Sequence, residues 1–128
     1  MKTSTLLLLI LITGSLIASA VAGDVTAVIK SPTLVYRINA INGSYLGQIQ
    51  PSGGVASVGC DGDTIAILNN QGIIYRYNAQ NGSFIGQIQP SGRAESVQVS
   101  GGVIVVRSGH YFYRYNAKSG NYIGQNQF

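Results

Sequence analysis

The sequence predicts an all-β protein made of three similar antiparallel sheets, and two repeated motifs predict it. A Tyr-Arg-x-Asn-Ala motif occurs three times at offsets of 39 and 38 residues, beginning at Tyr36, Tyr75 and Tyr113. Each copy continues through a Gly into an aromatic-aliphatic-Gly-Gln segment, which begins at Tyr45, Phe84 and Tyr122. The residues between these motifs form short runs rich in Val, Ile and Tyr, bounded by Gly, Asn and Asp, which is typical of strands joined by tight turns.

A repeat of about 40 residues built from strands is typical of β-propeller blades, each of which is a four-stranded antiparallel sheet. We therefore expect blades at about 23–50, 51–89 and 90–128. In the second blade the expected strands cover residues 55–60, 64–68, 73–78 and 84–89. Asp61-Gly62-Asp63 forms the first turn, with a positive φ at Gly62, and Asn69 to Gly72 forms the second.

The third blade repeats this order, with strands expected at 96–99, 103–107, 111–116 and 122–127. Its first turn, Ser100-Gly101-Gly102, is expected to be one residue shorter than Asp61-Gly62-Asp63-Thr64, which would explain the shorter offset without any change of strand register. The first blade aligns from Val25 onward with Thr64 onward. It therefore lacks its first strand if the segment before Gly23 is removed.

Alternation along the third strand of each blade separates the tyrosines from the arginines. We expect Tyr75, Tyr77, Tyr113 and Tyr115 to pack between blades. Arg37, Arg76 and Arg114 occupy one equivalent position per blade. Either they join neighbouring blades through backbone carbonyls, which we favour, or they line a shared surface as a basic ring.

The loop after each third strand has the chemistry of a tight turn. Asn39, Asn78 and Asn116 are predicted to accept backbone N–H groups two residues on, and the alternative is three polar ligands on one rim. The equivalent glycines Gly47, Gly86 and Gly124 lie within the fourth strands. There they indicate a bulge or the close approach of a neighbouring backbone.

The N-terminus has the features of a secretory signal. Lys2 precedes an apolar run over 6–12, and Ala20-Val21-Ala22 is a small-residue cleavage pattern, so we expect a signal peptide at 1–22 and a domain at 23–128. This predicts a secreted or periplasmic protein. A membrane contact is expected only if the segment stays uncleaved and acts as an anchor.

Several function classes gain little support from the composition. The 128 residues carry 8 Lys and Arg against 4 Asp and Glu, but the basic residues form no cluster, so nucleic-acid binding is not expected. Cys60 is the single cysteine, which excludes an intrachain disulfide and is best explained as a small buried side chain. His110 is the single histidine, and Asp61 with Asp63 is better explained as a turn than as a calcium site. We therefore expect no enzyme, no metal and no cofactor.

The segment from Ile74 to Ile85 resembles the repeat of quinoprotein-type, pyrroloquinoline-quinone-like propellers. Those blades carry an aliphatic-aromatic run, then Asp-Ala-x-Thr-Gly, then an aliphatic pair and Trp. Here Asn78 stands in place of the Asp, Gly82 matches the Gly, and Gly86 stands in place of the Trp. The resemblance implies the fold, and it implies a role like that of the non-enzymatic members, which are scaffolds in the bacterial envelope that hold other proteins. It does not imply the quinone cofactor.

Three blades are too few for a closed propeller, since rings contain about 4 to 8 blades. We therefore expect the ring to close only by oligomerisation, with a homodimer of six blades as the simplest form. The alternative is that the three blades are a fragment of a longer array.

Two functions follow from these observations. The first is a scaffold that binds an envelope or extracellular protein. The second is a multivalent carbohydrate-binding, lectin-like module, with one glycan site per blade that combines stacking and hydrogen bonding. The residues predicted to form these sites are Tyr45, Phe84 and Tyr122 with Gln48, Gln87 and Gln125.

Overall fold

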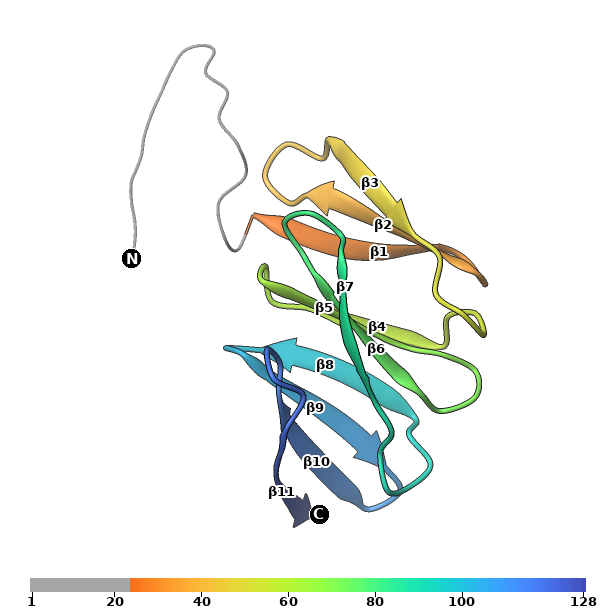
Figure 1. Cartoon of the computed structure of the whole chain (residues 1–128), viewed down its shortest axis with the longest axis vertical. Coiled ribbons are helices and arrows are strands. Elements are labelled where there is room, and N and C mark those ends of the chain that lie inside the picture. Colours follow the sequence, from red (N-terminus) through yellow and green to blue (C-terminus); the bar gives the residue numbers. More distant parts are fainter. Residues whose placement is uncertain (1–23) are drawn as a thin grey trace.

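The computed structural model describes residues 24–128, which form eleven strands in three antiparallel sheets and, within that range, no helix (Figure 1). The predicted signal peptide at 1–22 lies outside the described residues. No helix of the described part is long and apolar enough to cross a membrane. The all-β fold predicted from the repeats is confirmed.

The three sheets follow the three repeats in order. The first has the order β1-β2-β3, the second β4-β5-β6-β7 and the third β11-β10-β9-β8, and none of them closes onto another. The strands are β1 (Val25–Ser31), β2 (Leu34–Asn39), β3 (Tyr45–Ile49), β4 (Ser57–Cys60), β5 (Thr64–Leu68), β6 (Ile74–Asn78), β7 (Phe84–Ile88), β8 (Ser96–Ser100), β9 (Val103–Ser108), β10 (Tyr111–Asn116) and β11 (Tyr122–Gln127).

The predicted shortening of the first turn in the third blade is wrong. The pairs Cys60–Ile65 and Val99–Ile104 have the same spacing, whereas Leu68 pairs with Ile74 and Arg107 with Phe112, so the missing residue lies in the loop between β9 and β10.

Most predicted strand ends lie within one residue of the observed ends, and the main exception is the start of β4. The Val55 N–H donates to the carbonyl of Pro32 at 2.8 Å, in the first sheet, so Val55 belongs to a connection between sheets and the strand begins at Ser57. The first sheet has three strands in the described part. Its β1 corresponds to β5, so this sheet has no counterpart there of β4 or β8.

The sheets are stacked along the long axis of the molecule, with β1, β4 and β8 facing one another in turn (Figure 1). Two separate cores fill the spaces between them. Strand β5 contributes to both because its side chains alternate: Ile65 and Ile67 face the first sheet, whereas Ala66 and Leu68 face the third. Burying each of the large aliphatic side chains contributes roughly 1.5–3 kcal/mol, so the stacking of sheets is the main source of stability.

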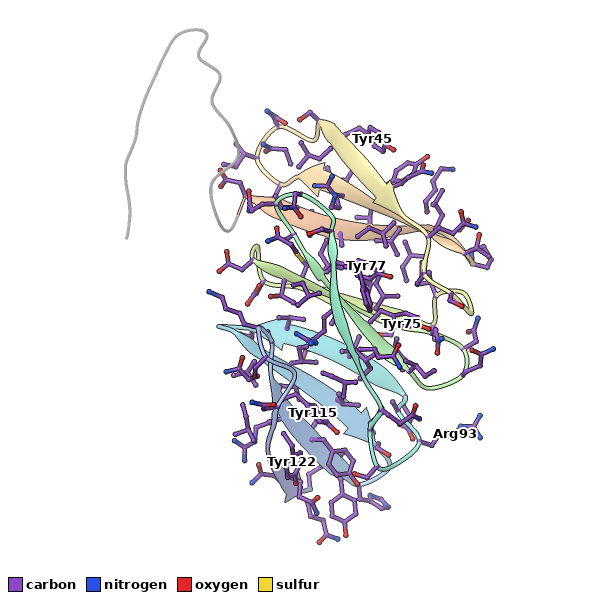
Figure 2. The ribbon with its side chains drawn as sticks, in the orientation of Figure 1. Tyr45, Tyr75, Tyr77, Arg93, Tyr115 and Tyr122 are labelled. Atoms are coloured by element: carbon purple, nitrogen blue, oxygen red, sulfur yellow. The ribbon has the colours of Figure 1, made fainter. Side chains whose placement is uncertain are left out.

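The tyrosines of the third strands lie between the sheets, as predicted. Tyr77 belongs to the core between the first and second sheets, with Tyr75 packed against it, and Tyr113 and Tyr115 belong to the core between the second and third. Figure 2 shows Tyr75 and Tyr77 beside the middle sheet and Tyr115 beside the last one. Burial raises the pKa of Tyr77 and of Tyr115, with smaller contributions from the neighbouring tyrosines.

The second and third sheets approach each other closely at Gly59 in β4. A Cβ atom at this position would lie 2.9 Å from the Cα of Gln98 and 2.9 Å from the backbone nitrogen of Val99, both in β8. Backbone atoms cannot move aside as a flexible side chain can, so glycine is required for the two strands to pack at this distance.

We expect the substitution Gly59→Ala to lower the free energy of unfolding by about 1–3 kcal/mol, because the added methyl group forces the second and third sheets apart. Urea unfolding followed by tyrosine fluorescence measures the change. Ser96→Ala, at an exposed position of β8, is the matched control and should leave the unfolding free energy within about 0.5 kcal/mol. Equal stability of the Gly59→Ala variant and this control would contradict the packing argument.

Candidate functional site

The loop between the third and fourth strands of each sheet has the same hydrogen bonds. The Asn39 side-chain oxygen accepts the N–H groups of Ile41 and Asn42 at 2.9 and 3.1 Å. Asn78 and Asn116 accept the equivalent N–H groups of their own loops. These three side chains are therefore turn caps, as predicted, with their oxygens engaged by the backbone.

The arginine that precedes each cap by two residues reaches the corresponding loop of the next sheet. Arg37 Nη1 donates to the carbonyls of Ala79 and Gln80 at 3.2 and 3.1 Å. Arg76 Nη1 donates to the carbonyls of Ala117 and Lys118 at 3.0 and 2.8 Å. We call each of these contacts an arginine clamp. Only 8% of Arg37 and 6% of Arg76 is exposed, so these two guanidinium groups join sheets and do not line an open surface.

Glycines shape both sides of each clamp. In the fourth strands of the first and second sheets, a Cβ at Gly47 would lie 2.6 Å from Nη2 of Arg37, and a Cβ at Gly86 would meet Nη2 of Arg76. In the receiving loop, a Cβ at Gly82 would lie 2.8 Å from Nε of Arg37. The expected bulge is present, since the register shifts beside Arg37, Arg76 and Arg114. The alternative of a close neighbouring backbone does not hold, because the group beside each of these fourth-strand glycines is the arginine of its own sheet.

Arg114 has the same position in the third sheet but has no further sheet to reach within residues 24–128. Its Nη2 would lie 2.7 Å from a Cβ at Gly124, which matches the pose of Arg37 beside Gly47. Its Nε is buried without an acceptor among the described residues, as are the Nε atoms of the other two arginines. The third clamp therefore has its donor in place and no acceptor among residues 24–128.

One aromatic ring at the start of each fourth strand is exposed to solvent. Tyr45, Phe84 and Tyr122 are 57%, 58% and 54% exposed, and we call them the exposed aromatic set. Each ring packs edge-on against a tyrosine of the neighbouring third strand, with centroid distances of 5.0 Å for Tyr36–Tyr45 and 5.7 Å for Tyr115–Tyr122. Figure 2 labels Tyr45 beside the first sheet and Tyr122 beside the third.

The glutamines predicted to accompany these rings behave differently from sheet to sheet. The Tyr45 hydroxyl donates to Gln48 at 3.4 Å, and the Tyr122 hydroxyl donates to Gln125 at 3.1 Å. Phe84 has no hydroxyl, so Gln87 has no equivalent bond from its ring. An exposed ring face can stack on a sugar or on an apolar side chain, and an adjacent amide can hydrogen-bond either.

Asp61 links two sheets through its carboxylate. One oxygen accepts the N–H groups of Asp63 and Thr64 at 3.0 and 2.9 Å, and the other accepts the N–H of Gly102, in the third sheet, at 2.9 Å. Burial alone raises the pKa of the Asp61 carboxyl, but the hydrogen bonds from Thr64, Asp63 and Gly102 outweigh burial and hold the pKa below its ordinary value. The described residues contain no group of three or more His, Cys, Asp or Glu side chains that could hold a metal.

Cys60 is half-buried, and its Sγ lies 3.4 Å from the carbonyl of Val25 in the first sheet. Burial raises the pKa of its thiol, and the nearby carboxylates of Asp61 and Asp63 raise it further. A thiol with a raised pKa is a poor nucleophile at neutral pH, so Cys60 contributes packing between the first two sheets.

Sequence reasoning did not identify a groove between the second sheet and its connection to the third. This groove of about 530 Å³ is bordered by the β5–β6 loop and the connector before β8, including Gln71, Arg93 and Glu95. Arg93 extends away from the ribbon there (Figure 2). The residues that border this groove come mainly from two segments that share no repeated motif, so no sequence signal marks the groove.

No protein-family model matches the sequence, and no curated protein matches it. Solved structures are similar to it in fold. BamB from Moraxella catarrhalis is 15% identical with a TM-score of 0.66, over 82% of this chain and 33% of that protein. The hydrazine synthase of Kuenenia stuttgartiensis is 13% identical with a TM-score of 0.65, over 84% of this chain and 33% of that one.

A quinohemoprotein alcohol dehydrogenase from Pseudomonas putida HK5 is 14% identical with a TM-score of 0.61, over 84% of this chain and 19% of that protein. The chain thus spans a third or less of the length of each of these proteins. The similarities show the fold, and they confirm at that level the resemblance to quinoprotein-type propeller repeats. Two of the three names are those of enzymes, so the fold alone does not decide between catalysis and binding.

We expect Arg76→Ala to lower the free energy of unfolding by about 2–3 kcal/mol, because it removes two charge-assisted hydrogen bonds and leaves the buried carbonyl of Ala117 without its donor. Urea unfolding at neutral pH measures the effect. Arg93→Ala removes the same charge from an exposed position and should change stability by less than about 0.5 kcal/mol. If both variants lose the same amount, the arginine clamp does not stabilise the stack.

The lowered pKa of Asp61 predicts a pH dependence of stability. A carboxyl whose pKa is lower in the folded state stabilises the fold above its unfolded pKa of about 3.9, and this contribution disappears as the pH falls through the folded pKa. The unfolding free energy of the wild type should therefore fall between about pH 5 and pH 2, and Asp61→Asn should flatten that slope. Asp63→Asn, at the exposed neighbouring position, should keep it; a slope that is the same in all three proteins would exclude Asp61 as its source.

Proposed function

We propose that this chain is an exported, non-catalytic propeller-repeat protein that acts as a protein-interaction scaffold and binds its partner through the exposed aromatic set. The observation that carries the proposal is the equivalence of Tyr45, Phe84 and Tyr122: three sheets each present one ring that is more than half exposed at the same position of the fold. Exposed rings held by a rigid sheet lose little conformational entropy on binding, which is why aromatic residues are enriched at protein interfaces.

Three further observations support a binding role. The resemblance of the repeat motif extends to non-enzymatic envelope scaffolds. Within residues 24–128 the Asp61 carboxylate and the guanidinium groups of the arginine clamps make hydrogen bonds that join sheets, so these charged groups have a structural role. Export to the periplasm or the cell exterior rests on the signal-like N-terminus, and an envelope or extracellular protein is the partner that such a location offers.

A glycan is the second candidate ligand, and the pairs Tyr45–Gln48 and Tyr122–Gln125 favour it. In each pair the tyrosine hydroxyl occupies the glutamine oxygen, so the amide NH₂ group can donate to a sugar hydroxyl beside the exposed ring. Two or three such sites on one rigid body would bind a repetitive glycan with avidity.

The exposed aromatic set can be tested with a triple variant, Tyr45→Thr, Phe84→Thr and Tyr122→Thr. Threonine suits a strand and removes the ring, so we expect the fold to persist and binding to be lost. The control is Ile85→Thr, which changes an exposed apolar residue one position further along β7, on the opposite face of its sheet. Circular dichroism verifies that both variants are folded.

Both proteins and the wild type are crosslinked in the envelope of the exporting cell and, separately, applied to a glycan array. The scaffold proposal expects protein crosslinks that the triple variant loses at least about tenfold and the control keeps. Array binding that the triple variant alone loses would replace the scaffold with the lectin-like function. Crosslinks and array signals that are equal in all three proteins would overturn both functions.

A further inference from the structure

We propose that the open face of the third sheet binds the open face of the first sheet of a second copy of this chain, and that Arg114 of one copy clamps the Ala40 and Ile41 carbonyls of the other. The proposal is independent of the function assigned to the exposed aromatic set. It follows from the interface between neighbouring sheets, which we call a joint. The described part of the chain contains this joint twice, each time with an arginine clamp.

The acceptor half of this joint is complete in the first sheet, and no arginine of residues 24–128 clamps it. Ala79 and Ala117, whose carbonyls accept the two existing clamps, are 0% exposed. Ala40 holds the same place in the first loop and is exposed, and Ile41 is 77% exposed. Gly43 has the same backbone conformation as Gly82 and Gly120, with φ of 77°, 77° and 78°. An arginine lies against Gly82 and Gly120, whereas no atom of the described residues lies within 4 Å of a Cβ at Gly43.

The donor half is complete and unused in the third sheet. Arg114 lies against Gly124 in the pose of the two clamped arginines. Phe128 stands one repeat after Pro51 and Pro90, both of which are buried, yet it is 54% exposed. It stacks on Phe112 at 4.5 Å. The third sheet thus presents a positioned guanidinium at Arg114 and, separately, an exposed ring at Phe128, over which the guanidinium of Arg107 lies 5.2 Å from the centroid.

Both open faces also carry the apolar residues that a joint buries elsewhere. Val28, on the open face of the first sheet, is 44% exposed, whereas Ile67 at the equivalent position of the second sheet is 0% exposed. On the open face of the third sheet, a groove of about 360 Å³ is bordered by residues that include Val105 and Phe112. Apolar surface repeated on two complementary faces is expected to be covered.

The side chain of Gln98 does not prevent this joint, although glycine is needed at the equivalent position of the second sheet. Gln98 holds the position of Gly59, where glycine is needed because β8 crosses it. In the described part of the chain, the first sheet has no strand that corresponds to β8. A glutamine at this position therefore has room beside the described strands of the first sheet, although it would clash with a four-stranded sheet.

The number of copies follows from ring size. Closed propellers contain about 4 to 8 blades, so two copies of three sheets make a six-bladed ring, and three copies would exceed the range. In such a ring the joint occurs twice, and each copy contributes Arg114 to one joint and Ala40 with Ile41 to the other.

The experiment is native mass spectrometry of the full chain, as recovered from the exporting cell, and of three variants. Arg114→Glu places a negative charge on the open face of the third sheet, opposite the two carbonyls of the other copy. Val28→Lys places a positive charge on the open face of the first sheet. Arg93→Glu is the charge-matched control at an exposed position outside both faces. We expect the wild type and Arg93→Glu to be dimers, and each joint variant to raise the dimer dissociation constant at least about tenfold.

Mixing the two joint variants separates a broken joint from a damaged fold. In a mixed dimer one joint carries both substitutions and the other carries neither, so an equimolar mixture should contain more dimer than either variant alone at the same total concentration. A monomeric wild type, or a dimer that Arg114→Glu weakens no more than Arg93→Glu does, would overturn the proposal. Wild-type species of more than two chains would overturn the closed ring, and a mixture that stays monomeric would overturn the assignment of the two faces.

Discussion

The structure depends on the joint in which an arginine of one sheet hydrogen-bonds the loop carbonyls of the next. Arg37 and Arg76 each span two sheets, and both are almost fully buried. A guanidinium suits this place because its planar set of N–H groups can serve two carbonyls at once, which the single ammonium of lysine does less well. Burial lowers the pKa of Arg76, but an arginine keeps its charge at any physiological pH. The joint is therefore insensitive to pH, whereas the neighbouring link through Asp61 titrates.

The joint also explains the glycines that a strand would otherwise avoid. Each arginine needs an opening in its own sheet, given by Gly47 or Gly86, and a second opening in the receiving loop, given by Gly82 or Gly120. The same loop must turn tightly, and there glycine supplies the positive φ that the turn requires. The repeat therefore keeps Arg and Gly together for two reasons, packing and backbone conformation. This coupling is why the motif recurs while the intervening positions vary between Ile, Tyr and Phe.

Much of this architecture can be predicted from the sequence because it depends on local chemistry. The period, the turn caps at Asn39, Asn78 and Asn116, and most strand ends follow from alternation and turn residues. Contacts between repeats are less accessible. The identity of the group beside Gly86 depends on the direction of a side chain across a bulge, and the need for Gly59 depends on the distance between two sheets. The groove beside Arg93 joins two segments that share no motif, so no periodic signal could reveal it.

A stack of identical joints has a consequence that one isolated domain does not have. Each joint between two sheets pairs the arginine of one sheet with the loop carbonyls of the next. A linear stack of three sheets therefore leaves the arginine of the last sheet and the loop carbonyls of the first sheet unpaired. Terminal units of repeat proteins usually avoid this problem with polar outer faces. Here Gln98 and Arg107 are polar replacements for Gly59 and Leu68, but Val28 and Arg114 remain as the internal joints would need them. These polar replacements are confined to β8 and β9, on the side where the described part of the first sheet has no counterpart of β4 or β8. The two outer faces are therefore complementary to each other and do not resemble a pair of polar caps.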